Sequence, residues 1–230
     1  MRKPLKEHLR RVWKGWGREI LIVLAIVIPL RSSVADWHDV PSGSMRPTII
    51  EGDRIFVNKL AYDLKIPLTT WHLARWGGPQ RGDIVICYSP ANGTRLVKRI
   101  VGIPGDRIAL RDNRLTINNK PVQYGPLEQK GDTRTVQGSQ SVFLREDLTG
   151  KSHAIQIIPA RPARRSFAPV MVPPGQFLVL GDNRDDSADS RYFGFVERSQ
   201  VVGRVRSVVF SLDPDHWPLP RQDRWFKSLD

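Results

Sequence analysis

The sequence predicts a mainly β protein, with an N-terminal membrane-anchor helix followed by a β-rich domain into which a smaller β subdomain is inserted. Two observations predict this organisation. Beyond Val40, short runs of β-branched and apolar residues alternate with Gly, Pro, Asn and Asp, a pattern typical of antiparallel strands and their turns. Ahead of them lies an apolar run of eleven residues, 20–30, with the composition of a membrane-embedded helix.

The N-terminal segment divides into a basic arm, residues 1–18, and an anchor, residues 19–36. The arm carries many lysines and arginines against the single acid Glu7, a bias that keeps such segments on the cytoplasmic side of a membrane. The apolar run covers about half of a ~30 Å bilayer core, so the anchor crosses only if the helix includes Trp16 and Gly17 or continues past Arg31 to Val34 and Ala35. Alternatively, the segment is a cleavable signal peptide that ends at the small residues Ser33-Val34-Ala35. The local pattern leaves this choice open, and both interpretations place the rest of the chain outside the cytoplasm.

The amino-acid composition limits the kinds of molecule that the protein can bind. The net charge of +13 suits an anionic membrane or a nucleic acid. Beyond the arm, basic residues alternate with acids and form no basic stripe, so we expect a lipid bilayer as partner and no nucleic acid. The single cysteine, Cys87, lies in an apolar β run and is interpreted as a buried structural thiol. The sequence has neither Cys/His metal spacing nor a phosphate-binding glycine loop, so no cofactor is expected.

Residues 37–111 and 174–230 are predicted to form the larger β domain, and residues 112–173 the inserted subdomain. The insertion is more polar and carries no chemical motif. Asp112-Asn113 and Asn118-Asn119 have the residues that tight hairpin turns prefer. The expected strands include residues 54–57, 83–86, 107–110, 176–180 and 205–210.

Ser44 and Lys98 are candidate reactive residues. Ser44 lies in Pro41-Ser42-Gly43-Ser44-Met45, where small turn-forming residues would expose its hydroxyl. Lys98 lies in an apolar run without a nearby histidine, and burial there would lower its pKa from ~10.4 towards a neutral amine that can act as a base. A serine and a lysine together can carry out acyl transfer. Taken singly, each pattern is more often an ordinary turn or a solvated charge.

Four segments resemble, in order and spacing, the sequence boxes of bacterial type I signal peptidases (leader peptidases). Residues 41–48 are similar to the serine box, residues 82–85 to the next box, and residues 98–106 to the lysine box. Residues 181–191 are similar to the last box and give the most specific match. The resemblance covers most of residues 37–210 apart from the insertion. It implies a β-rich serine endopeptidase, anchored in the membrane, that removes N-terminal signal peptides from exported preproteins.

The resemblance also implies roles for individual residues. Ser44 is the expected nucleophile and Lys98 the general base, while Ser187 is expected to hydrogen-bond the lysine amine and fix its direction. The Ser42 hydroxyl and the Ser44 backbone N–H would form the oxyanion hole. The resemblance favours an uncleaved single-pass anchor in the cytoplasmic (inner) membrane of a bacterium, with the catalytic domain on the periplasmic side.

Two further groups of residues complete the expected site. Charged residues are expected to form ion pairs that brace the last box against the lysine strand, because a free acid near the amine would stabilise its charged form. These residues are Asp182, Asp189, Arg99 and Arg191. Apolar residues similar to the family's pocket lining would accept small side chains, the Ala-X-Ala preference of the family, from a peptide bound as an added strand. They are Val40, Met45, Ile86 and Val97.

We expect a monomer, and two alternatives for its function stay open. One is a specialised peptidase that matures a single substrate, such as a conjugation-type pilin peptidase. The other is a catalytically idle, basic binding module tethered to the membrane.

Overall fold

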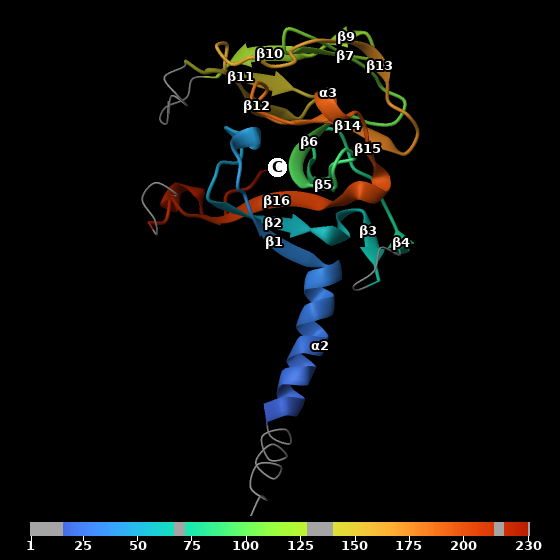
Figure 1. The fold of residues 1–230 in the computed structure, drawn as a ribbon, viewed down its shortest axis with the longest axis vertical. Coiled ribbons are helices and arrows are strands. Elements are labelled where there is room, and N and C mark those ends of the chain that lie inside the picture. Colours follow the sequence, from blue (N-terminus) through green and yellow to red (C-terminus); the bar gives the residue numbers. More distant parts are fainter. Residues whose placement is uncertain (1–15, 67–71, 128–139, 214–218, 230) are drawn as a thin grey trace, which may run out of the picture.

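A seven-stranded sheet forms the centre of the protein, and helix α2 (Arg18–Ser33) projects from it (Figure 1). The computed structural model describes residues 16–66, 72–127, 140–213 and 219–229. Every strand pair in these residues is antiparallel. The mainly β fold predicted from the sequence is therefore confirmed.

The large sheet places β16 (Val201–Ser211), a late segment of the chain, between two strands that precede it in sequence. From edge to edge it contains β1 (Ala35–Asp39), β2 (Asp53–Asn58), β16, β5 (Ile84–Tyr88), β6 (Arg95–Gly102), β14 (Gln176–Leu180) and β15 (Val196–Glu197). Residues of β2 are alternately buried and half-buried, as expected for a strand with one face on a core. In β5 the first four residues are all buried, because both faces of this central strand are covered.

Two smaller sheets pack beside the large one. One contains β13 (Phe167–Met171), β7 (Arg107–Arg111), β8 (Arg114–Ile117) and β9 (Lys120–Pro121), and the other contains β10 (Gln123–Pro126), β11 (Val142–Asp147) and β12 (Ser152–Ile157). The predicted hairpin turns are confirmed, since both residues of each Asx pair have φ between 47° and 64° and connect paired strands. The first small sheet begins before residue 112, and the division of the chain at residues 112 and 173 stays a prediction.

The protein also contains a short hairpin and five short helices in its described residues. A two-stranded hairpin is formed by β3 (Asp63–Lys65) and β4 (His72–Arg75). The short helices are η2 (Gly43–Met45), η3 (Lys59–Ala61), α3 (Ser190–Phe193), η5 (Arg198–Gln200) and η6 (Gln222–Arg224).

Buried apolar residues form three clusters, one of which joins the large sheet to a small one. Val101, Leu178 and Leu180 of the large sheet pack with Ile108 and Leu115 of the first small sheet. A second cluster lies under the η2 loop and includes Met45, Ile55, Ile86 and Val205. Cys87 is buried in a third cluster, as predicted, and burial raises the pKa of its thiol to about 12. This packing holds η2 and β6 in fixed positions relative to each other.

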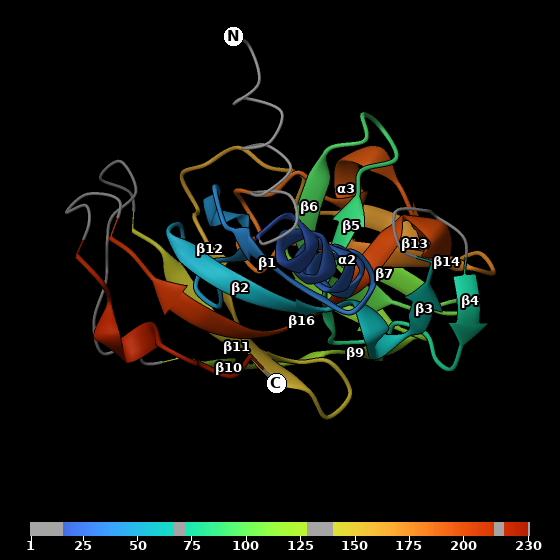
Figure 2. The ribbon, with the colours of Figure 1, turned by 90° about the horizontal axis from the view of Figure 1, so that it is seen from below.

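Helix α2 leaves the β body as an isolated element, which Figure 2 shows end-on. Its 16 residues give a length of about 24 Å. No helix in the described part of the chain is long and apolar enough to cross a membrane. Residues 35–36 of the predicted anchor belong to β1, and the predicted arm before Trp16 lies outside the described residues.

Candidate active site

Ser44 lies in η2, on the connection between β1 and β2, and faces β6. Its Oγ lies 2.6 Å from Nζ of Lys98. Two contacts fix the loop: the neighbouring Met45 is buried in the core, and the backbone N–H of Asn183 donates to the Ser44 carbonyl oxygen at 3.1 Å. The loop therefore presents the serine hydroxyl to one particular side chain of β6.

The Lys98 side chain is almost completely removed from solvent, with 2% of the residue exposed. Its Nζ also donates to the carbonyl oxygen of Val97 at 2.9 Å. Burial lowers the pKa of the Lys98 amine, and the nearby carboxylates of Asp189 and Asp182 act in the opposite direction. Since burial outweighs these carboxylates, the site favours the neutral amine more than water does.

Arginines hold both of the nearby carboxylates. Arg99 donates to Asp182 through two nitrogens, at 2.8 and 2.7 Å, and Arg191 donates to Asp189 with the same two distances. Burial alone would raise the pKa of Asp182, but the Arg99 guanidinium, together with His153 and the Thr48 hydroxyl, outweighs burial and lowers it. All four expected charged residues are therefore paired and buried.

The two ion pairs differ in what they connect. Arg99–Asp182 joins β6 to the last box, as expected. The expectation of a brace is wrong for Asp189–Arg191, because both residues belong to the last box. Asp189 instead caps α3 and accepts the backbone N–H of Gly181, so this pair shapes the box itself.

The expected hydrogen bond between Ser187 and the lysine amine is not formed. The Ser187 hydroxyl is buried and has no hydrogen-bond partner in the described structure. The lysine amine instead contacts Ser44 and the Val97 carbonyl. Ser187 lies against Gly181, where an added Cβ would lie 2.5 Å from the Ser187 Cβ and from the Ser44 carbonyl oxygen.

A cavity of about 280 Å³ opens beside Ser44 and Lys98. Ser42 also lines it, and the Ser42 side chain makes no capping hydrogen bond to η2. The structure brings all four expected apolar residues to this cavity: Val40, Met45, Ile86 and Val97. Polar residues that the sequence did not point to also contribute, and these are His38, Asp39, Thr94 and Arg95.

Comparison with known sequences decides the family of the chain. The sequence model of the family described as "Signal peptidase, peptidase S26" matches residues 13–210. The chain belongs to the signal peptidase family. It is 34% identical to signal peptidase I of Pseudomonas fluorescens, over 90% of this chain and 74% of the relative. It is also 34% identical to signal peptidase I of Bacillus caldolyticus, over 93% of each chain. As a member of the signal peptidase family, it is a serine endopeptidase.

Sequence reasoning missed two residues that hold this signal peptidase site together. Besides its backbone contact to Ser44, Asn183 donates from its side chain to the Gly43 carbonyl oxygen at 3.2 Å. The Thr48 hydroxyl donates to Asp182 at 2.5 Å and so links the serine loop to the Arg99 ion pair. An asparagine inside the last box was the available signal, because an amide can satisfy loop carbonyls, but nothing in the sequence identified its partner.

Proposed function

We propose that this chain removes N-terminal signal peptides from exported preproteins with Ser44 as nucleophile and Lys98 as general base. The observation that carries the proposal is the 2.6 Å distance between Ser44 Oγ and a buried lysine Nζ. This distance lies within the range needed for proton transfer between a nucleophile and its base.

The reaction follows from this geometry. Neutral Lys98 accepts the Ser44 proton as Oγ bonds to the scissile carbonyl carbon. The Ser42 hydroxyl and the Ser44 backbone N–H donate to the resulting oxyanion. The lysine ammonium then gives its proton to the leaving amine as the C–N bond breaks. Water hydrolyses the acyl ester in a second cycle, in which Lys98 again accepts a proton.

The cavity beside the dyad would select the residues that precede the cleaved bond. Its volume of about 280 Å³ is at the lower end for a ligand pocket, and much of its lining is apolar. Val40, Met45, Ile86 and Val97 would accept small side chains, which corresponds to cleavage after Ala-X-Ala-like sites.

We also propose that helix α2 holds the enzyme on the cytoplasmic membrane of a bacterium. The described apolar side chains of the helix are each about half exposed, so the β body leaves them uncovered. These side chains are Ile20, Leu21, Ile22, Val23, Leu24 and Val27. In this arrangement, the basic arm, residues 1–18, stays cytoplasmic, and the β body lies on the periplasmic side as a monomer.

A cleavage assay tests the proposed dyad. The full chain in detergent is incubated with a purified preprotein, and the new N-terminus of the product is sequenced. Ser44→Ala and Lys98→Ala should each abolish cleavage, whereas Lys120→Ala on β9 should cleave like the unmodified enzyme. Full activity in both dyad variants would overturn the mechanism.

Two further measurements separate the alternatives. A general enzyme cleaves a panel of unrelated preproteins, whereas a dedicated pilin-type peptidase cleaves one. Covalent labelling of Ser44 by a penem-type acylator would exclude an idle binding module.

A further inference from the structure

The cavity beside the dyad has a charged residue in its lining that the proposed reaction does not use. Along β6, the lining passes from Lys98 and Val97 at the dyad to Arg95 and Thr94 at the start of the strand. We propose that Arg95 is a specificity-determining residue, which favours an acidic over a basic side chain at the third residue before the cleaved bond. This inference rests on the proposed function, because it requires that the cavity bind the residues that precede that bond.

The start of β6 has a strand edge to which a peptide can be added. On one side, β6 pairs with β5 from Arg95 to Arg99. On the other side, its pairing with β14 begins only at Arg99 in the described residues. Leu96, Val97 and Lys98 line the cavity along this stretch. An extended peptide added to such an edge is held by backbone hydrogen bonds, and its alternate side chains point to the same face.

The register of the strands determines which peptide residue meets Arg95. Arg95 and Val97 are two residues apart on β6, so their side chains point to the same face and are spaced by roughly 7 Å. The first and third residues before the cleaved bond have the same spacing in an extended peptide. With the first residue at the dyad beside Val97, the third lies beside Arg95.

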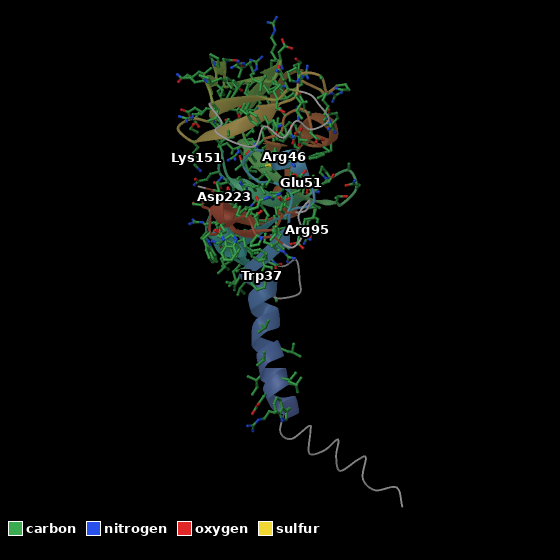
Figure 3. All side chains as sticks on the ribbon, turned by 90° about the vertical axis from the view of Figure 1, so that its left-hand side faces the viewer. Trp37, Arg46, Glu51, Arg95, Lys151 and Asp223 are labelled. Atoms are coloured by element: carbon green, nitrogen blue, oxygen red, sulfur yellow. The ribbon has the colours of Figure 1, made fainter. Side chains whose placement is uncertain are left out.

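The direction of the peptide follows from the position of helix α2. Strand β1 begins next to α2 and ends at Asp39, which lines the cavity. Figure 3 shows Arg95 on the α2 side of Arg46 and Glu51, which follow the serine in the chain. A signal peptide is N-terminal and contains an apolar segment, so the residues before the cleaved bond come from the membrane. They therefore reach the dyad by passing Arg95.

The Arg95 guanidinium is available to a substrate. The side chain is exposed, and it has no ion-pair or hydrogen-bond partner in the described residues. An arginine is charged at any pH at which the enzyme works. It therefore attracts a carboxylate and repels an ammonium group brought close to it.

The other ionisable residues of the lining do not cancel this charge. Asp39 is paired with Arg54, which does not line the cavity. His38 lies 3.5 Å from the carboxylate of Asp36. Lys98 is held at the serine hydroxyl, and burial lowers the pKa of its amine. The charge selectivity of the lining is thus assigned to Arg95.

The test compares cleavage-site peptides that differ in charge. The full chain in neutral detergent is given four peptides, with Ala, Gln, Glu or Lys at the third residue before the cleaved bond. The Glu and Gln side chains have nearly the same shape, so the ratio of their kcat/KM values isolates the effect of charge. We expect kcat/KM to be about threefold higher for Glu than for Gln and about threefold lower for Lys, as for an exposed charge pair. Both ratios should approach one in concentrated sodium chloride, which screens exposed charges.

Variants connect the preference to Arg95. Arg95→Gln should bring the Glu and Lys peptides within about twofold of each other, and Arg95→Glu should reverse their order. Arg107→Gln on β7 removes the same charge from a small sheet and should keep the preference of the unmodified enzyme. Each ratio is measured within one variant, so a change in the amount of folded enzyme cancels.

The inference is overturned if the unmodified enzyme cleaves the Ala peptide but cleaves the Glu and Lys peptides equally well, or if Arg95→Gln keeps the preference. Failure to cleave any of the four peptides would instead overturn the proposed function, and this inference with it.

Discussion

Replacing Gly181 by alanine is expected to displace the nucleophile without removing any reactive group. The added Cβ would lie 2.5 Å from the Ser44 carbonyl oxygen, and closer still to the Ser187 hydroxyl, whereas ordinary contacts begin near 3.4 Å. Rotation can move the Ser187 hydroxyl, which has no partner to lose, but it cannot move the Ser187 Cβ, which would also lie 2.5 Å from the added Cβ. The Ser44 carbonyl cannot move freely, since the Asn183 N–H binds it at 3.1 Å. The serine loop must therefore shift by nearly an ångström.

Two magnitudes follow from this displacement. Inserting a methyl group into a filled site destabilises a protein by about 1–3 kcal/mol. Misplacing a reactive group by about 1 Å lowers the rate roughly 10²-fold, which corresponds to about 2.7 kcal/mol in the activation barrier. We thus expect kcat/KM to fall by about two orders of magnitude in a protein that still folds.

The measurement pairs kcat/KM on a fluorogenic cleavage-site peptide with urea denaturation. Gly125→Ala on β10 is the matched control, because no atom lies within 4 Å of its added Cβ and its φ is not positive. The reasoning is refuted if Gly181→Ala keeps activity within threefold of the unmodified enzyme, or if Gly125→Ala loses as much.

The remaining predictions concern the dyad and the ion pair behind it. Lys98→Met should lower kcat by about 10²- to 10⁴-fold. It should also raise the free energy of unfolding in urea, because a buried amine with a lowered pKa destabilises the fold at any pH below its unfolded value of ~10.4. In the unmodified enzyme, kcat/KM should rise with pH as Lys98 loses its proton, and a rising limb centred on ~10.4 would contradict the effect of burial. Arg99→Leu leaves Asp182 buried without its guanidinium and should destabilise the protein by about 3–5 kcal/mol at neutral pH. Because the Asp182 pKa is lowered in the fold, this loss should shrink as pH falls through that pKa, and a pH-independent loss would argue against it.

Local features of the sequence were sufficient for the fold class. An alternation of apolar and polar residues favours a strand regardless of which other strand it pairs with. Each of the five expected runs lies largely within a strand. The Asp112-Asn113 turn was predictable for the same reason, since its positive φ angles are a property of the residues themselves. In β16, however, pairing continues from Val201 to Ser211, beyond the expected residues 205–210, because β2 and β5 flank it.

The contacts within the site were less predictable because they depend on packing between distant segments. Lys98 and Ser44 could be named from their boxes, but the direction of the amine depends on the Val97 carbonyl and on burial. The resemblance therefore gave Ser187 a hydrogen bond that this structure does not form. Likewise, Thr48 and Asp182 are separated by 134 residues, and no local pattern connects them.

The position of β16 has a consequence for the order in which activity arises. This strand lies between β2 and β5, yet it follows both of them in the chain by more than 100 residues. A nascent chain that has already released both the serine and the lysine has an open sheet, with no strand to bring their supports together. Such non-local pairing forms late in folding. A chain synthesised only as far as Lys98 is therefore inert, and the protease becomes competent only after β16 has been made and has paired with β2 and β5.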